Sequence, residues 1–260
     1  SPMSRGLGDV YKRQYMEFFR TTEKMFTCFE KPVMKTVSPA PIEILKEICK
    51  TPTVIPALFP FRTLDKYLKS KFSEPKLQQL FGRYATYVGG SPLNSPALMA
   101  LVWQAEAKGV WTVKGGISSV AKAIERLAED RGVEFIYGHR VIEIQQSKHL
   151  VNKVCLDDGT NYEADAIIFN GDPRALALGL LGEGLRKVTK KIRNTPRSLS
   201  ANVWGFESKH VNKNLVHHNV FFSDEVNSEF YEIQKGKIPK DPTLYILSLI
   251  HISEPTRHRR

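Results

Sequence analysis

Hydrophobic and polar residues follow two different periods between residues 109 and 172. After the glycine pair Gly115-Gly116, apolar residues recur at helical spacing as far as Gly132, which predicts a helix that ends at this glycine. The apolar residues that follow alternate or cluster over shorter stretches, which predicts strands at residues 133–137, 141–144 and 150–156. Asp158-Gly159 predicts a hairpin turn into a strand at 162–169, and the continuous apolar run over 166–169 is typical of a strand covered on both faces.

The preceding residues, 15–110, have mostly helical periodicity. We predict helices at 15–28, 42–49, 64–72, 77–84 and 95–102. Thr63 suits the cap of the third helix, and Ser95-Pro96 suits the start of the last, because serine caps helices and proline fits the first turn. Lysines lie around the apolar side of the 64–72 helix, which fits either a helix on an anionic bilayer or a solvated face over an ordinary core.

The residues after Asp172 return to a strand-like pattern. Residues 176–192 are predicted as helix or loop, and the alternation that follows predicts strands at 198–206, 219–222, 230–233 and 239–246. Helices and strands therefore share the chain, and the order of helix, strand, antiparallel meander and buried strand favours an α/β fold.

Composition excludes several classes of protein. The chain has 260 residues and is 42% hydrophobic, which is enough for one large or two small cores. No apolar run reaches the length of a membrane span, and the start does not resemble a signal peptide. The net charge of +11 suggests nucleic acid or an anionic membrane, yet no nucleic-acid-binding motif accompanies it, so we predict no nucleic-acid partner. The three cysteines match no metal or redox motif.

Several stretches resemble the FAD-dependent superfamily of amine oxidases and phytoene desaturases: GVWTVKGG, RVIEI, DDG, ADAIIFNGDP, RSLSANVWGF and HHNVFFSDE. The last two are most similar to bacterial hydroxyneurosporene desaturases, which are 1-hydroxycarotenoid 3,4-desaturases. The resemblance runs from about residue 15 to 246. It implies an FAD cofactor and a long apolar carotenoid substrate. It also implies a cytoplasmic protein that touches the inner face of the cell membrane peripherally.

The same resemblance implies two interleaved domains, an FAD-binding domain and an α+β substrate domain. The helical part of the substrate domain would be 15–110, part of the FAD-binding domain 111–178, and the sheet part of the substrate domain 179–246. Residues 1–14 and 247–260 resemble translated sequencing-adapter DNA, or are ordinary flexible termini. No glycine-rich turn stands between a strand and a helix to hold a pyrophosphate, and Gly6 and Gly8 do not supply it. We therefore expect an internal fragment of a longer flavoprotein, which alone would be inactive and bind FAD poorly.

Three residues are candidates for contact with the cofactor. In the family the backbone of the valine in the RVxxI strand, here Val141, meets the adenine of FAD. Asn170 and Asp172 follow a predicted buried strand at its carboxyl end, where α/β sheets place ligands, although Asp172 could equally cap the next helix. From its sequence context alone, Val141 would be a core valine.

Three further residues are candidates for the substrate cavity: Trp111, Trp204 and His218. The tryptophans suit stacking on a polyene or flavin but are more often core residues. The pair His217-His218 could move a proton, yet no serine, cysteine or carboxylate stands at a spacing that defines a triad or a metal site. A histidine pair at a strand edge is the alternative. We assign no catalytic side chain and predict no metal.

The chemistry implied by the resemblance is the introduction of a carbon–carbon double bond, with hydride transfer to FAD. Carbons of an apolar chain carry no acidic hydrogen, so a protein of this kind supplies mainly a dry, long cavity and orientation. The alternatives are another enzyme of the superfamily, such as a phytoene desaturase, a retinol saturase-like enzyme or a protoporphyrinogen oxidase, and a non-catalytic basic module that binds membranes.

Overall fold

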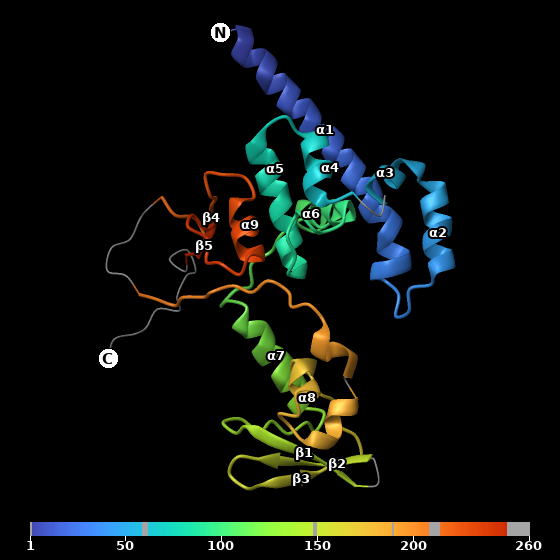
Figure 1. Cartoon of the computed structure of the whole chain (residues 1–260), viewed down its shortest axis with the longest axis vertical. Coiled ribbons are helices and arrows are strands. Elements are labelled where there is room, and N and C mark those ends of the chain that lie inside the picture. Colours follow the sequence, from blue (N-terminus) through green and yellow to red (C-terminus); the bar gives the residue numbers. More distant parts are fainter. Residues whose placement is uncertain (1, 59–61, 148–149, 189, 208–213, 249–260) are drawn as a thin grey trace. The chain divides into compact units, whose positions relative to one another are not determined.

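The computed structural model divides the chain into two compact units. It describes residues 2–58, 62–147, 150–188, 190–207 and 214–248. Unit 1 comprises residues Ser1–Ile117 and Ser198–Arg260, and unit 2 comprises Ser118–Arg197 (Figure 1). The units divide the chain after residues 117 and 197, whereas the sequence suggested 110 and 178. The assignment of cofactor and substrate roles to these regions stays a prediction.

The first part of unit 1 is helical. Its α-helices are α1 (Pro2–Phe29), α2 (Pro41–Lys50), α3 (Ile55–Leu58), α4 (Leu64–Lys71), α5 (Pro75–Gly82) and α6 (Trp103–Ala107). Between them lie a π-helical turn, η1 (Glu30–Met34), and the 3₁₀ helices η2 (Pro52–Val54), η3 (Arg83–Val88) and η4 (Ala97–Leu101). Thr63 caps α4 as expected, because its hydroxyl accepts a hydrogen bond from the Lys66 N–H.

The helix predicted at 95–102 begins two residues later than expected, at Ala97, and it is a 3₁₀ helix. Ser95 and Ala97 are tied to another stretch of backbone: the Leu64 N–H donates to the Ser95 carbonyl at 2.8 Å, and the Ala97 N–H donates to the Arg62 carbonyl at 2.9 Å. This pairing holds Pro96 extended, so the helical turn begins only after it, as η4, and continues into α6. A tertiary contact has overridden the local helix-start pattern.

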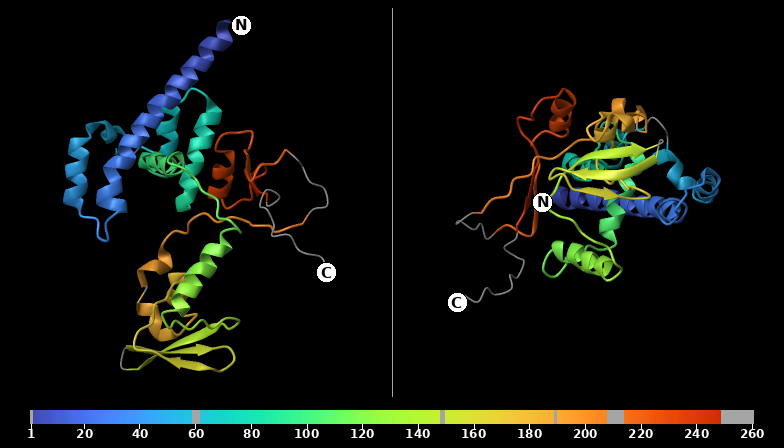
Figure 2. Two further views of the ribbon diagram at one scale, coloured as in Figure 1. Left: turned by 180° about the vertical axis from the view of Figure 1, so that it is seen from behind. Right: turned by 90° about the horizontal axis from the view of Figure 1, so that it is seen from below.

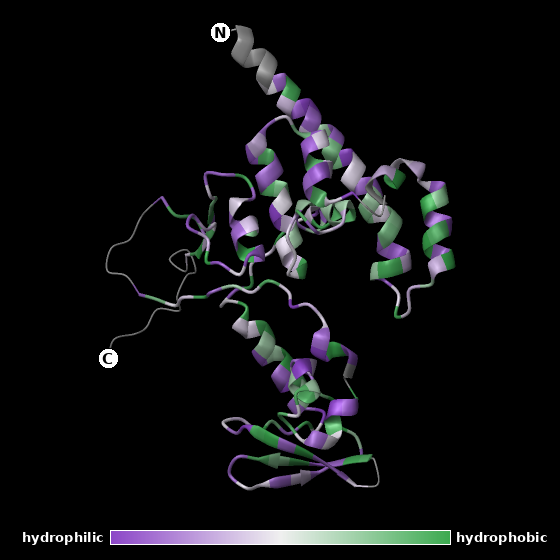
Figure 3. Cartoon of the chain, in the orientation of Figure 1, coloured by the Kyte–Doolittle hydropathy of each residue, from purple (hydrophilic) through white to green (hydrophobic). Residues whose placement is uncertain are grey.

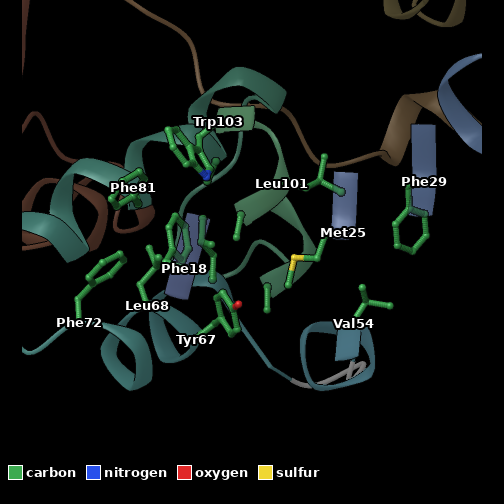
Figure 4. Close-up of a cluster of buried hydrophobic side chains, with 14 of the residues drawn as sticks. Phe18, Met25, Phe29, Val54, Tyr67, Leu68, Phe72, Phe81, Leu101 and Trp103 are labelled. Atoms are coloured by element: carbon green, nitrogen blue, oxygen red, sulfur yellow. The ribbon is translucent and has the colours of Figure 1, made fainter. Parts of the chain in front are cut away.

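One hydrophobic core joins these helices (Figure 4). Phe18 of α1 is fully buried, and its ring centroid lies 4.6 Å from that of Phe81 and 4.9 Å from that of Phe72. Thr22, one turn further along α1, accepts hydrogen bonds from the Trp103 indole at 2.8 Å and from the Gln104 amide at 2.9 Å. The polar groups that α6 brings into the core are thus satisfied, which burial requires.

The second part of unit 1 returns to these helices from far along the chain. It contains β4 (His218–Phe221), α9 (Ser228–Gln234) and β5 (Leu244–Leu247), with β4 antiparallel to β5. Glu229 of α9 is buried and forms an ion pair with the partly exposed Arg83, and it also accepts hydrogen bonds from the N–H and hydroxyl of Thr243, both at 2.9 Å. Figure 1 and the left view of Figure 2 place α9 beside α5.

Two further side-chain contacts fix the same junction. The Asn227 amide donates to Asp65 of α4 at 2.6 Å, and the Gln79 amide of α5 donates to the Ser223 carbonyl at 2.8 Å. Asn227 and Ser223 are both buried. Contacts between residues distant in sequence, rather than local pattern, therefore position β4, α9 and β5 on the helices.

Unit 2 consists of a helix, a small antiparallel sheet and short helices. The elements are α7 (Ser118–Glu129), β1 (Val141–Ser147), β2 (Leu150–Leu156), β3 (Asn161–Glu163), α8 (Pro173–Ala177), η5 (Glu183–Lys187) and η6 (Lys190–Asn194). The sheet order is β1-β2-β3. The predicted Asp158-Gly159 turn joins β2 to β3: Gly159 has φ +87°, and Asp158 accepts a hydrogen bond from the Thr160 N–H at 2.9 Å. A small core of Ile144, Leu176 and Leu185 lies between β1, α8 and η5.

Three predicted strands are wrong and a fourth is confirmed only at its start. Residues 133–137, 166–169 and 198–206 have no strand structure, and 230–233 belong to helix α9. The strand predicted at 162–169 is present only where it overlaps β3 (Asn161–Glu163). The run 166–169 was expected to be covered on both faces, yet Ile168 is 96% exposed. A strand needs a neighbour to pair its backbone, and none of the described strands lies alongside the first three segments. Figure 3 shows the hydrophobic residues along α7, which has the same position there as in Figure 1.

Within the ranges that the structure describes, no helix combines the length and the apolar character that a membrane span requires.

Candidate functional site

Two tyrosines of unit 1 donate hydrogen bonds to the same carboxylate. Tyr84 and Tyr87 are three residues apart on the 3₁₀ helix η3, so their side chains lie on the same side. The Tyr84 hydroxyl donates to Glu106 Oε2 at 2.6 Å, and the Tyr87 hydroxyl donates to Oε1. The two rings stack with centroids 5.6 Å apart. This arrangement fixes the position of Tyr87, although 67% of its surface is exposed.

The carboxylate keeps both hydroxyls protonated. Burial and the hydrogen bond to Glu106 raise the pKa of Tyr84, and the hydrogen bond to Glu106 together with burial raises that of Tyr87 to about 12. A nearby negative charge disfavours the phenolate, so both groups act as donors at neutral pH. Sequence reasoning missed this cluster because Glu106 is distant in sequence from both tyrosines and on another element.

The predicted cavity residue His218 begins strand β4. His218 lies opposite Leu247 in the ladder, and Val220 lies opposite Tyr245, so these four side chains share one face. His218 Nδ1 is hydrogen-bonded to the Tyr245 hydroxyl, and the two rings stack with centroids 6.0 Å apart. His218 therefore does occupy a strand edge, but it has a polar partner, Tyr245, that the sequence did not reveal.

The neighbouring His217 has a structural position. Its Nδ1 donates to the Ser248 carbonyl at 2.8 Å, and its ring meets the His218 ring edge-on with centroids 4.4 Å apart. A carbonyl oxygen only accepts, so this bond defines which nitrogen of His217 carries the proton. His217 thereby orients the ring of His218.

The other two predicted cavity residues are not in the core. Trp111 is 81% exposed and Trp204 is 84% exposed, and neither lies in a helix or strand. The interpretation of these two tryptophans as core residues is therefore wrong; the buried tryptophan is Trp103. The stacking of Trp111 and Trp204 on a polyene or flavin stays a prediction.

In unit 2, Val141 begins β1 and lies opposite Leu156. A bulge follows it, between Val141 and Glu143, and the side chain of Val141 is 37% exposed, so Val141 is not a core valine. A bulge interrupts the regular ladder, and bulges are over-represented at sheet edges and next to active sites. The contact of this backbone with adenine stays a prediction.

Asp172 caps helix α8, as one of the two sequence interpretations held. Its Oδ1 accepts a hydrogen bond from the Arg174 N–H at 3.0 Å, and its Oδ2 lies 2.7 Å from Arg197 Nη2. The hydrogen bond to Arg197 and that from the Arg174 backbone lower the pKa of Asp172. Asn170, two residues earlier, is exposed. Among the described residues, no hydrogen bond joins Val141 to Asn170 or Asp172.

Two other features lie apart from these candidates. His139, Asp157 and Asp158 gather beside the β2–β3 hairpin, with His139 Nδ1 3.4 Å from Asp158 Oδ2. All three are exposed, and backbone N–H groups of Arg140 and Thr160 already bind the two carboxylates. An open groove of about 630 Å³ follows α1. It is lined by Asp9, Lys12, Arg13, Met16, Glu17, Arg20, Thr21, Lys24 and Thr53.

The chain belongs to the flavin-containing amine oxidoreductase family, whose model matches residues 55–235 and so includes parts of both units. The resemblance noted in the sequence is thereby confirmed at the level of the family. A mixture of helices and strands, as observed, is compatible with an α/β flavoprotein, and the family description implies a flavin cofactor.

Among curated proteins, the chain is 44% identical over 234 residues to the hydroxyneurosporene desaturase of Cereibacter sphaeroides, covering 90% of this chain and 47% of that protein. It is 40% identical over 239 residues to that of Rhodobacter capsulatus, covering 92% and 48%. It is 34% identical over 232 residues to a 1-hydroxycarotenoid 3,4-desaturase of a Flavobacterium species, covering 88% and 45%. The chain thus spans about half the length of these relatives.

Proposed function

We propose that this chain is part of an FAD-dependent carotenoid desaturase that introduces carbon–carbon double bonds into an acyclic 1-hydroxycarotenoid. The observation that carries the proposal is the identity of 34–44% to three proteins that act on hydroxylated carotenoids, over about nine-tenths of this chain. Both units contribute to that similarity. A bound flavin would accept the hydride, and the proton lost from the adjacent carbon would pass to water or a base.

The described residues lack the pyrophosphate-binding turn that a dinucleotide site needs. Backbone N–H groups at the end of a glycine-rich turn between a strand and a helix hold the pyrophosphate of a dinucleotide. None of the strands β1 to β5 leads into a helix through such a turn. Val141, next to its bulge, remains our proposed contact for the adenine. The residues present do not form a complete site, so we assign them no step in the reaction.

The test uses the full-length protein that contains these residues. It is expressed with an acyclic 1-hydroxycarotenoid and, separately, with phytoene, and pigments are followed by absorption. A chromophore lengthened only on the hydroxylated substrate supports the proposal. A chromophore lengthened only on phytoene would make the protein a phytoene desaturase. If the protein binds flavin but converts neither carotenoid, it catalyses another reaction of the family. A protein without flavin absorbance that binds anionic vesicles would favour the non-catalytic module.

We also propose peripheral contact with the inner face of the cell membrane, through α2. Ile42 and Leu45 of this helix are 59% and 55% exposed, and the lysines of the helix, Lys46 and Lys50, each pair with a glutamate one turn earlier. An exposed apolar strip on a helix whose charges are paired suits the interface of a bilayer. Ile42→Ser together with Leu45→Ser should reduce co-sedimentation of the full-length protein with anionic vesicles. Unchanged sedimentation would exclude α2 as the contact.

A further inference from the structure

The β4–β5 ribbon presents one polar pair on an otherwise apolar face. The face carries His218, Val220, Tyr245 and Leu247, and all four side chains are exposed. Val220 is 45% exposed and Leu247 is 47% exposed, so each side of the polar pair has an accessible apolar neighbour. Such a surface suits a ligand that is mostly apolar but has one hydrogen-bonding group.

The hydrogen-bonding capacity of the pair matches an aliphatic hydroxyl. His218 Nδ1 and the Tyr245 hydroxyl share one hydrogen bond, and the proton in that bond can come from either group. If tyrosine donates, His218 Nε2 carries a proton and can donate to a ligand. If histidine donates, Nε2 accepts, and the tyrosine hydroxyl is left to donate. Both arrangements leave the pair able to satisfy an alcohol, which both donates and accepts.

The pair is packed against a neighbouring histidine. His217 packs edge-on against His218 and is itself anchored to the Ser248 carbonyl.

We propose that His218 and Tyr245 bind the terminal hydroxyl of the polyene and so select hydroxylated over unhydroxylated acyclic carotenoids. This inference rests on the proposed function. A site that hydrogen-bonds a substrate hydroxyl discriminates against the analogue that lacks it, because its polar groups are then left without a partner. The two residues are specificity determinants and take no part in the removal of hydrogen.

The experiment measures the ratio of kcat/KM for a 1-hydroxylated acyclic carotenoid to that for its unhydroxylated analogue, in the full-length flavoprotein. Tyr245→Phe removes one oxygen and His218→Phe removes both ring nitrogens. Each should lower the ratio about tenfold, the loss of one to two hydrogen bonds. His218→Gln retains a donor and an acceptor and should restore part of the preference. Tyr231→Phe, which changes an exposed tyrosine on α9, should leave the ratio unchanged.

The outcomes separate this inference from the proposed function. An equal fall in kcat/KM for both substrates in Tyr245→Phe, with the ratio preserved, would show a structural role and overturn the inference. A wild-type protein that desaturates both substrates equally well would overturn it too, while leaving carotenoid desaturation intact. A flavin-loaded wild-type protein that desaturates neither would overturn the proposed function. If His218→Phe does not fold, the ratio for Tyr245→Phe decides.

Discussion

Helices α4 and α7 have the same amphipathic pattern but opposite surroundings. Leu64, Tyr67 and Leu68 of α4 are buried in the core of unit 1. The apolar side of α7 contains no buried residue, and Ile124 and Leu127 are 62% and 52% exposed. Periodicity therefore predicts that a helix forms and which of its faces is apolar, but it does not predict what covers that face. Coverage depends on residues elsewhere in the chain.

The largest expected difference in the free energy of unfolding is between variants at two matched leucines, one in each helix. Leu68→Ala, in α4, should lower the free energy of unfolding of unit 1 by about 2–5 kcal/mol, because it removes buried methyl groups and leaves a cavity. Leu127→Ala, in α7, should change the stability of unit 2 by less than about 1 kcal/mol, since its side chain is half exposed and alanine favours helix.

Urea unfolding followed by peptide-level hydrogen exchange measures the two units separately. Losses of equal size in the two variants would mean that α7 is covered in solution. A partner segment would then have to be sought for it.

A smaller effect is expected at the ion pair between Glu229 and Arg83. Glu229→Gln keeps an acceptor for Thr243 but removes the charge that faces Arg83, so unit 1 should lose about 1–3 kcal/mol. The loss of stability is limited because the Arg83 side chain is 29% exposed and can be solvated by water. Glu225→Gln, an exposed change in the same segment, is the control. A loss in the control as large as in Glu229→Gln would show that the segment, and not the ion pair, is sensitive.

The smallest effect is expected at the exposed pair of Asp172 and Arg197 in unit 2. The pKa of Asp172 is lowered in the folded state from its ordinary value of 3.8. The ion pair therefore stabilises unit 2 fully at pH values above 3.8. This stabilisation is lost as the pH falls through the lower, native pKa. Asp172→Asn should remove the contribution of this carboxylate to the pH dependence but keep the cap of α8, whereas Asp172→Ala should lose both. Unfolding curves at pH 7 and pH 3 measure this, and equal behaviour of the two variants would exclude a capping contribution.

Elements whose hydrogen bonds are local were predicted well, and strand β4, which pairs with the distant β5, was predicted from its alternation alone. Thr63 and the helix after it, and the Asp158-Gly159 hairpin, follow from neighbours within a few residues. The segments 133–137, 166–169 and 198–206 have strand-like patterns without strand structure, because a ladder depends on a partner that periodicity cannot supply.

The candidate site shows the same limit. The capping position of Asp172 was one of two interpretations open from the sequence, since a cap is a local feature. Other contacts of the site join residues on different elements. These are the hydrogen bond between His218 and Tyr245 and the hydrogen bonds that Tyr84 and Tyr87 donate to Glu106. No spacing rule links such residues. Trp111 and Trp204 could not be placed either, because tryptophan is compatible with both core and surface.

The contacts of Glu229, Asn227 and Ser223 with the early helices have a consequence for biosynthesis. Unit 1 is built from two stretches with the whole of unit 2 between them, so its closure requires contacts of very long sequence separation. During translation the helices of unit 1 emerge from the ribosome first. The surface that α9 later contacts stays exposed until Thr243 has been synthesised and has left the ribosome. Folding should therefore be slow and chaperone-dependent at this stage, and prior folding of unit 2 should accelerate it by shortening the loop that has to close.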